Sequence, residues 1–551
     1  MYRGKHMIDE IALRVLEKRY LARDEAGTPV ESVEDMFRRV ADHVAGSDGS
    51  CDRASRRKIS DTYFQMMHDL EFLPNSPTLM NAGRDLGQLA ACFVLPVEDS
   101  LDSIFESVKE TAKIHQSGGG TGFSFSRLRP KGDIVRSTMG AASGPVSFIR
   151  VFNMATEVIK QGGTRRGANM GILRIDHPDI EEFVTIKNDP CELTNFNLSV
   201  AVTDKFFQSC YRNELFSLIN PRNGQVVRKI EALNLMGLIA RCAWETGEPG
   251  LVYIDTVNRS NPTPHLGPIE ATNPCGEQPL LPYESCCLGS IDCAKVVREG
   301  RIDYDRLKAL VHHAVRFLDD TIDAGRYPIQ AIRDISRANR KIGLGVMGFA
   351  HMLIKLDIPY DSGQAVTAAR DLMSFIDNES KAASRGLAAE RGVFPNYRGS
   401  TWEKKGIPLR NATTTTIAPT GTLSILAGTS SGIEPIYDIE YSRILFGGLR
   451  VNVIDPLYKE LQGTLDPGRL EGLFRKAYDV SPEWHCAIQK AFQDHVDNAV
   501  SKTINLNARA TPQDIESIYM KAHEMGLKGI TVFRDTSRDA QILSCRTQQT
   551  C

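Results

Sequence analysis

Apolar residues recur every three to four positions through much of the first ninety residues. From Ile8 to Tyr20 they follow the 3.6-residue period of a helix, which predicts an amphipathic helix. Ser32 and Asp35 have the spacing of a capping box, and a second apolar repeat begins directly after them at Met36. The pattern therefore predicts a helical N-terminal region over residues 1–90.

After this region the pattern changes, and short runs of β-branched and apolar residues alternate with helical periods. Leu215–Asn220 and Thr413–Ile417 have the composition of strands, and Asp305–Asp323 repeats like a helix. Such alternation is typical of α/β domains with largely parallel strands. We expect one catalytic α/β domain over residues 91–536, and the polar stretch 537–551 predicts a flexible tail.

Length and charge narrow the function. The chain has 551 residues, 42% of them hydrophobic, which suffices for a large core. Its 66 basic and 68 acidic residues leave a formal charge of −2, too balanced for a field that grips nucleic acid or an anionic membrane. No apolar run approaches the roughly 18 residues that span a bilayer. We therefore expect a cytoplasmic protein without a nucleic-acid or membrane partner.

Twelve cysteines are too few for a disulfide scaffold in a chain of this length. Buried, metal-binding or redox-catalytic roles are the alternatives. Cys286, Cys287 and Cys293 suggest a zinc cluster, but zinc sites favour two spaced cysteine pairs, and no matching C-x-x-C is present. The spacing thus disfavours zinc, and we expect no metal site.

The densest group of reactive side chains is the string Asn273-Pro-Cys-Gly-Glu277. In an extended segment, the period of two would place Asn273, Cys275 and Glu277 on one face. An amide, a thiol and a carboxylate would then enter the same pocket. The plain alternative is a cysteine in a loop beside an incidental turn.

A second candidate site follows the predicted strand Thr413–Ile417, where the chain continues as Pro419–Ser424. A strand that breaks at proline and glycine and opens a helix presents backbone N–H groups to an anion, together with the hydroxyls of Thr420, Thr422 and Ser424. The segment lacks the lysine of a Walker loop, so ATP hydrolysis is not implied. The pattern fits a phosphate cradle or a purely structural junction.

Two further glycine-rich segments are less specific. Gly118–Gly122 lacks the spacing of a dinucleotide-binding loop. Gln161–Gly167 combines a pliable backbone with two arginines, which suits phosphate or base recognition but equally describes a solvated basic turn.

Together these motifs resemble the catalytic subunit of ribonucleotide reductases, most closely the adenosylcobalamin-dependent class II enzymes. The resemblance covers nearly the whole chain and is carried by Ala12–Tyr20, Pro74–Thr78, Cys92, Asn273–Glu277, Ser285–Ser290, Pro419–Ser424 and Gly529–Arg534. It implies an α/β fold, the ten-stranded α/β barrel of the ribonucleotide reductase and glycyl-radical superfamily. A central finger loop would carry Cys275, since burial in a barrel protects a radical from water.

The resemblance also implies roles for the reactive residues. Cys275 would be the thiyl radical that removes the 3′-hydrogen of the ribose, Glu277 the general base for the 3′-hydroxyl, and Asn273 a ligand of the substrate hydroxyls. Cys92 and Cys286 would be the redox pair, in which one protonates the departing 2′-hydroxyl and both then close a disulfide. Such a pair requires Cα atoms within roughly 7 Å.

Nucleotide sites are implied in the same way. The substrate phosphates would bind at Ser76 and at Pro419, Thr420, Gly421, Thr422, Leu423 and Ser424. A deoxynucleotide (dNTP) effector that sets specificity would contact Asp99, Ser100, Leu101 and Arg129, and Gln161 and Arg165 would carry its signal to the substrate. In the family the effector site lies at a dimer interface, which implies a homodimer.

The class follows from what is missing. Thr531–Arg534 stands where class I enzymes have the tyrosine pair that imports a radical, and it contains no tyrosine. The tail shows neither the radical glycine nor the zinc-cysteine site of class III. The resemblance therefore implies adenosylcobalamin as cofactor, and a thioredoxin- or glutaredoxin-type dithiol as reductant, acting through Cys545 and Cys551.

The expected reaction is reduction of a ribonucleotide, a diphosphate by the closest resemblance, to the 2′-deoxyribonucleotide. One alternative is a class I-like catalytic subunit that needs a metal-containing radical partner. The other is a catalytically inactive nucleotide-binding regulator on the same fold, which would not require all of Asn273, Cys275, Glu277, Cys92 and Cys286.

Overall fold

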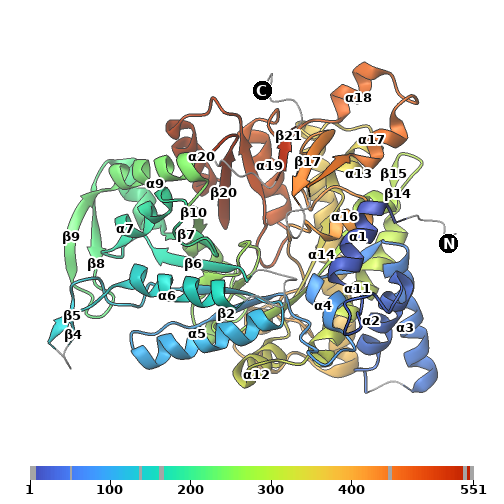
Figure 1. Cartoon of the computed structure of the whole chain (residues 1–551), viewed down its shortest axis with the longest axis horizontal. Helices are drawn as coiled ribbons and strands as arrows, with labels where there is room; N and C mark the ends of the chain where they lie inside the picture. The colour runs from blue at the N-terminus through green and yellow to red at the C-terminus, as the bar shows by residue number, and fades with distance from the viewer. Residues whose placement is uncertain are drawn as a thin grey trace. The chain divides into compact units, whose positions relative to one another are not determined.

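The computed structural model describes residues 8–49, 52–135, 139–159, 167–444, 450–537 and 543–545. Contacts divide the chain into two units, which Figure 1 draws together. Unit 1 comprises residues 8–91, 286–502 and 543–545, and unit 2 comprises 92–285 and 503–537. Within the described ranges, no helix combines the length and apolarity needed to cross a membrane.

Unit 1 begins with the predicted helices. The capping box forms as expected, because the Ser32 side chain accepts from the backbone N–H of Asp35 and the Asp35 carboxylate accepts from that of Ser32. Asp9 caps the first helix by accepting from the Ala12 N–H at 2.8 Å. The elements of this region are α1 (Glu10–Arg19), α2 (Val33–Ala45), α3 (Arg53–His68), β1 (Phe72–Pro74) and α4 (Ser76–Asn81).

The rest of unit 1 is built around strand β13 (Ser285–Asp292). It pairs antiparallel with β1 and parallel with β16 (Ile342–Met347). The predicted strand Thr413–Ile417 forms only isolated parallel bridges, from Thr415 to Leu344 and from Ile417 to Val500. The predicted helix Asp305–Asp323 is confirmed as α11.

The remaining elements of unit 1 are mostly helices. In chain order they are β14 (Val297–Arg298), β15 (Arg301–Ile302), α11 (Tyr304–Ala324), α12 (Gln330–Asn339), α13 (Phe349–Lys355), α14 (Gly363–Arg391), α15 (Thr401–Lys404), α16 (Leu423–Ala427), β17 (Glu440–Ile444), β18 (Arg450–Ile454), α17 (Pro456–Leu461), α18 (Pro467–Leu473), α19 (Pro482–Gln493) and β21 (Leu543–Cys545).

A buried ionic network braces unit 1. The Asp319 carboxylate on α11 accepts from Arg340 at 2.8 Å and from the side-chain amide of Asn411 at 2.9 Å. Arg391 on α14 bridges Asp320 and Asp48, so the helical N-terminal region is fastened to α11 and α14. Removing one partner of such a buried pair costs about 3–5 kcal/mol, because the other charge is left uncompensated.

Unit 2 is built on a sheet of order β2-β3-β6-β7-β10-β20-β19. The first five strands are parallel to one another, β20 joins β10 antiparallel, and β19 is parallel to β20. This confirms the largely parallel sheet that the alternation predicts. The strands are β2 (Cys92–Leu95), β3 (Gly120–Ser124), β6 (Asn169–Arg174), β7 (Phe196–Val202), β10 (Gly250–Tyr253), β19 (Thr503–Leu506) and β20 (Gly529–Arg534).

Helices and small hairpins complete unit 2. The predicted strand at Leu215 is β8 of an antiparallel hairpin. The elements are α5 (Leu101–Gln116), β4 (Ile134–Val135), β5 (Gly140–Ala141), α6 (Pro145–Val158), α7 (Ile180–Thr185), α8 (Asp204–Arg212), β8 (Leu215–Ile219), β9 (Val226–Glu231), α9 (Ala232–Thr246), α10 (Ile254–Arg259), β11 (Ala271–Thr272), β12 (Pro279–Leu280) and α20 (Pro512–Glu524).

The β11–β12 hairpin crosses strand β3 at the glycine-rich segment. A Cβ added at Gly122 would lie 1.7 Å from the carbonyl oxygen of Thr272, and one at Gly120 would lie 3.0 Å from the ring of Pro274. Only glycine leaves room for this crossing. These glycines therefore admit the chain's own hairpin and not a bound ligand.

Candidate active site

The Asn273–Glu277 string forms the turn of the β11–β12 hairpin. Gly276 donates its N–H to the Asn273 carbonyl at 3.0 Å and has a φ of +79°. The Asn273 side-chain oxygen accepts from the Gln278 N–H at 2.9 Å. The segment is therefore a turn and not an extended strand, because an asparagine side chain and a left-handed glycine close it.

The turn leaves two of the three side chains buried and the third exposed. Asn273 and Glu277 are 2% and 3% exposed, whereas Cys275 is exposed at the tip. The common face that an extended segment would give these three residues is therefore not formed. A thiol at the tip of a fixed turn is open to a reactant.

Cys92 joins the buried side of the turn. It is the first residue of β2, is 4% exposed, and its Sγ accepts from the Asn273 side-chain amide at 3.1 Å. The same amide hydrogen-bonds the Glu277 carboxylate. Three of the predicted catalytic residues thus form one cluster, with Asn273 fixing the other two.

Asn197 is a contributor that the sequence reasoning missed. Its side-chain amide on β7 donates to the Pro274 carbonyl at 2.8 Å and holds the turn from the sheet. The available signal was its position, because it is the one exposed residue in an otherwise buried strand. A polar residue in such a strand indicates a specific partner.

The environment of Glu277 suits proton transfer. Burial raises the pKa of this carboxyl to about 7, and the hydrogen bond from Asn273 opposes part of that rise. Near neutral pH the group is therefore present in both its acid and its base form, which is the condition for an effective general base.

Cys286 lies on β13 in unit 1 and is 1% exposed. Its thiol contacts two backbone carbonyls, those of Cys287 at 3.7 Å and Lys341 at 3.6 Å. Its carbonyl accepts from the N–H of Ala91, the residue before Cys92, at 3.3 Å. Within unit 1, Cys286 is therefore hydrogen-bonded to the residue that precedes Cys92 in the sequence.

The neighbouring cysteines behave differently. Burial raises the pKa of the Cys287 thiol to about 12, and the Cys293 thiol donates to the Met347 carbonyl at 2.9 Å. In the part of the chain that the structure describes, no three histidine, cysteine or acidic side chains are grouped to hold a metal ion. The zinc alternative thus finds no ligand set there.

Two hydroxyls of the predicted phosphate cradle form hydrogen bonds within their own loop. The Thr420 hydroxyl accepts from the Gly432 N–H at 2.7 Å, and the Ser424 hydroxyl bonds that of Ser431 at 2.8 Å. Contact of either hydroxyl with a substrate phosphate stays a prediction. Helix α16, which Pro419–Ser424 opens, has five residues. Serine and threonine hydroxyls commonly form such local hydrogen bonds.

Thr422 faces outward from this loop toward the N-terminal helices. The Arg19 guanidinium at the end of α1 donates to its hydroxyl at 3.4 Å. Next to it, the Tyr20 hydroxyl bonds Ser76 at 2.7 Å. The partners of Ser76 and Thr422 are thus consecutive residues of the chain, and a shared phosphate site stays a prediction. Arg19 was missed, because nothing in the local sequence distinguishes it from Lys18.

The predicted effector residues lie at the start of α5 and after β3. The Arg129 guanidinium binds the Asp99 carboxylate with Nε at 2.8 and 3.1 Å from its two oxygens. The Ser100 hydroxyl caps α5 by accepting from the Ser103 N–H, and Leu101 is 64% exposed. Asp99 and Arg129 come together, while Ser100 is occupied by the cap.

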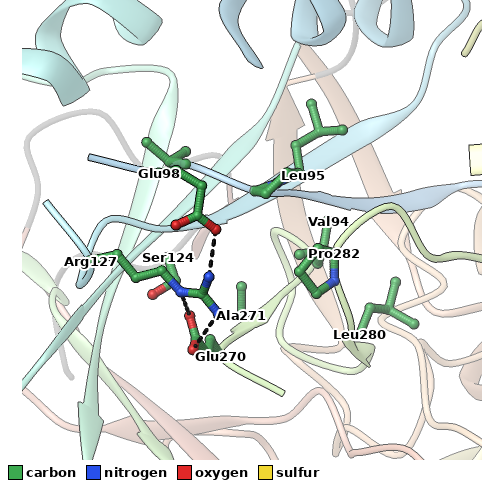
Figure 2. Close-up of a pocket in the computed structure, with 11 residues that line it drawn as sticks. Val94, Leu95, Glu98, Ser124, Arg127, Glu270, Ala271, Leu280 and Pro282 are labelled. Atoms are coloured by element: carbon green, nitrogen blue, oxygen red, sulfur yellow. Dashed lines mark hydrogen bonds and ion pairs between the residues drawn. The ribbon is translucent and has the colours of Figure 1, made fainter. Parts of the chain in front are cut away.

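A small pocket lies beside these residues (Figure 2). Its volume is about 20 Å³, enough for a water molecule. The walls are mostly apolar, and Arg127 spans the rim between two glutamates. The lining residues are Val94, Leu95, Pro96, Val97, Glu98, Ser124, Arg127, Glu270, Ala271, Leu280 and Pro282.

Some predicted residues cannot be placed. Gln161 and Arg165 lie outside the described residues, as does Cys551. Cys545 ends strand β21, with its backbone opposite Tyr441 of β17. The roles predicted for these four residues stay predictions.

Comparison with known proteins identifies two matching families. Residues 90–533 match the family described as "Ribonucleotide reductase, barrel domain", and residues 6–87 match "Ribonucleotide reductase, all-alpha domain". Relatives from two organisms bear the name vitamin B12-dependent ribonucleoside-diphosphate reductase. The relative from Thermoplasma acidophilum is 46% identical, over 98% of this chain and 80% of its own length. The relative from Mycobacterium tuberculosis (strain H37Rv) is 49% identical, over 97% and 78%.

A more distant relative is the ribonucleoside-diphosphate reductase subunit alpha of Chlamydia pneumoniae. It is 26% identical over 91% of this chain and 57% of its own length.

Proposed function

The chain belongs to the ribonucleotide reductase family, and on this premise we propose that it is an adenosylcobalamin-dependent ribonucleoside-diphosphate reductase with a thiyl-radical mechanism. Membership confirms the predicted enzyme family and fold class, a barrel domain preceded by an all-α region. The two relatives at 46% and 49% identity are both named as B12-dependent, which supports this cofactor here.

The observation that carries the mechanism is the Asn273–Glu277 turn. It exposes the Cys275 thiol and holds a carboxyl with a pKa of about 7 two residues away. Adenosylcobalamin, when bound, supplies the oxidising radical at Cys275.

The chain's own residues then divide the chemistry. The Cys275 sulfur radical takes the 3′-hydrogen, and Glu277 takes the proton of the 3′-hydroxyl. Asn273 holds Glu277 and Cys92 in place through its amide. The Cys92 thiol gives a proton to the 2′-hydroxyl, which leaves as water.

The two electrons for the reduction come from Cys92 and Cys286. Their thiols are oxidised to one disulfide while the ribose carbon is reduced, and Cys275 regains its radical when it returns hydrogen to C3′. The hydrogen bond between Ala91 and Cys286 supports this pairing. An external dithiol protein then reduces the disulfide, by way of Cys545 and Cys551.

The substrate phosphates bind, in this proposal, between the Pro419–Ser424 loop and the end of α1. Thr422 and Ser76 supply hydroxyls, and Arg19 supplies the positive charge that a phosphate requires. A diphosphate is the proposed substrate, because both B12-dependent relatives above are named for it.

A deoxynucleotide effector binds, in this proposal, at Asp99 and Arg129 and selects the base that is reduced. Asp99 lies just before helix α5, and α5 packs on helix α6. These helices carry four exposed apolar side chains, of 64%, 52%, 64% and 75% exposure, from Leu101, Phe105, Met154 and Val158. Such a patch supports a homodimer through this face.

The test is an anaerobic assay of the purified protein with CDP, a dithiol and adenosylcobalamin. We expect deoxycytidine product without a second protein, none without cobalamin, and none from Cys275→Ala. The matched control is Cys191→Ala, which removes another exposed thiol of unit 2. Product from Cys275→Ala would refute the mechanism, and dependence on an added metalloprotein would refute the cofactor.

A further inference from the structure

Arg127 bridges two carboxylates from distant parts of unit 2. Its Nη1 donates to Glu98 at 2.5 Å, and its Nε and Nη2 each donate to one oxygen of Glu270 at 3.0 Å. Figure 2 shows the guanidinium lying between the two glutamates. Glu98 follows the end of β2, and Glu270 directly precedes β11. Arg127 thus links the end of β2 to the hairpin that carries Cys275.

A second ion pair lies next to this bridge. Asp99 follows Glu98 in the chain and pairs with Arg129, which is two residues from Arg127. One peptide bond joins the two carboxylate residues, so a displacement of Asp99 also displaces Glu98. The proposed effector residues are therefore mechanically connected to the Arg127 bridge.

The pocket under the bridge leaves room for such a displacement. Its volume is about 20 Å³, and its apolar walls come from both linked segments, Val94 and Leu95 on β2 and Ala271 and Leu280 on the hairpin. Close-packed interiors resist relative movement, whereas a void permits it. The hairpin base therefore has both a tether and space to move.

We propose that Arg127 is the positioning residue that couples effector occupancy at Asp99 and Arg129 to the placement of the Cys275 hairpin. This inference rests on the effector control proposed above. An effector phosphate that pairs with Arg129 competes with Asp99 for it. The segment of Asp99 and Glu98 then shifts, and Glu270 follows because a bidentate pair fixes direction as well as distance.

The bridge has little to do with stability, because exposed ion pairs contribute little to it. The Arg127 side chain is 44% exposed, and Glu98 is 50% exposed. Replacing Arg127 should therefore leave the protein folded, but the carboxylates of Glu98 and Glu270 would no longer be held together. This separates a coupling role from a structural one.

The experiment follows the Cys275 thiol directly. We would measure its alkylation rate by iodoacetamide with peptide mass spectrometry, without substrate, with and without dATP or dTTP. Cys191, the other exposed cysteine of unit 2, is the internal standard. The variants are Arg127→Gln and Glu270→Gln, and the matched control is Arg259→Gln, which breaks an exposed ion pair with Asp204 at 2.7 Å in the same unit.

In the parent protein and Arg259→Gln, we expect a deoxynucleotide to change the Cys275 rate and the preferred base in the reductase assay. Allosteric couplings are typically about 5–150-fold. In Arg127→Gln and Glu270→Gln, both responses should fall below about 2-fold, while effector affinity by calorimetry stays within about 3-fold of the parent.

Three results would overturn the inference. Full effector responses in Arg127→Gln would show that the bridge carries no coupling. Loss of effector binding in Arg127→Gln would make Arg127 an effector ligand instead. A parent protein whose Cys275 rate and base preference ignore every bound deoxynucleotide would refute the effector proposal itself, and the coupling role with it, while leaving the Cys275 assay intact.

Discussion

Glu277→Gln tests the most unusual group of the site. A glutamate has an ordinary pKa of 4.5, and burial raises that of Glu277 to about 7. At 1.36 kcal/mol per pKa unit, holding this carboxylate ionised costs the folded protein about 3 kcal/mol. A neutral glutamine of the same shape avoids that cost, so the variant should be more stable but inactive.

The pH dependence gives the prediction its sign. A carboxyl with a raised native pKa incurs no cost below about pH 4, where it is protonated in both states. The cost grows between about pH 4 and 7 and is complete above pH 7. Glu277→Gln should therefore match the parent protein near pH 4.5 and exceed its stability at pH 8.

The size of the effect is measurable. At about 2.1 cal/mol/K per residue, the 551-residue chain has an unfolding entropy of about 1.2 kcal/mol/K, so 3 kcal/mol corresponds to a Tm increase of about 3 °C at pH 8. Calorimetry at the two pH values checks this. A lower Tm for Glu277→Gln at pH 8 would refute the claim that the carboxylate is buried at a cost.

Kinetics test the same group independently. Below pH 7, kcat/KM of the parent should fall about tenfold per pH unit, as Glu277 becomes protonated and can no longer accept the 3′-hydroxyl proton. Glu277→Gln should lose about 10²–10⁴-fold in kcat, the usual contribution of a general base. A parent profile that is flat between pH 5.5 and 7.5 would contradict this role.

Three further changes have distinct expected outcomes. Arg19→Gln should raise KM for CDP about tenfold with kcat unchanged, because one charge-assisted phosphate contact is lost. The control Lys18→Gln should leave both constants unchanged. Equal effects of the two variants would exclude a phosphate role for Arg19. Gly122→Ala should abolish turnover and lower Tm, because its Cβ would lie 1.7 Å from the Thr272 carbonyl oxygen of the hairpin. The control Gly386→Ala, in a helix with open space around it, should be neutral or stabilising. Calorimetry and the CDP assay test both variants. Cys92→Ser should abolish multiple turnovers with dithiol present, and normal steady-state rates would remove it from the mechanism.

Short-range sequence patterns predicted several helices and their start points correctly. The capping box of Ser32 and Asp35 and the helix α11 form where the residue spacing predicts them, because helix starts and amphipathic faces depend on residues within a few positions. The string around Cys275 identified the family for a similar reason, since a few chemically demanding residues stand at fixed short spacing.

Short-range sequence patterns did not predict the hydrogen-bond partners of side chains that have several possible partners. Asn273 could lie on an extended face or close a turn, and its own hydrogen bonds selected the turn. The hydroxyls of Thr420 and Ser424 hydrogen-bond Gly432 and Ser431, partners that the local sequence pattern did not indicate. Periodicity describes which residues share a face only while the backbone stays regular.

The amino-acid sequence alone determined the family, the α/β class and the helical start, and it predicted which cysteine, acid and amide react. Tertiary structure alone decided that Asn273 links Cys92 to Glu277, that Arg19 lies against Thr422, and that Arg127 bridges Glu98 and Glu270. These contacts join residues far apart in the chain. Burial and partner choice, which set a pKa or an ion pair, exist only once the chain has folded and brought such residues together.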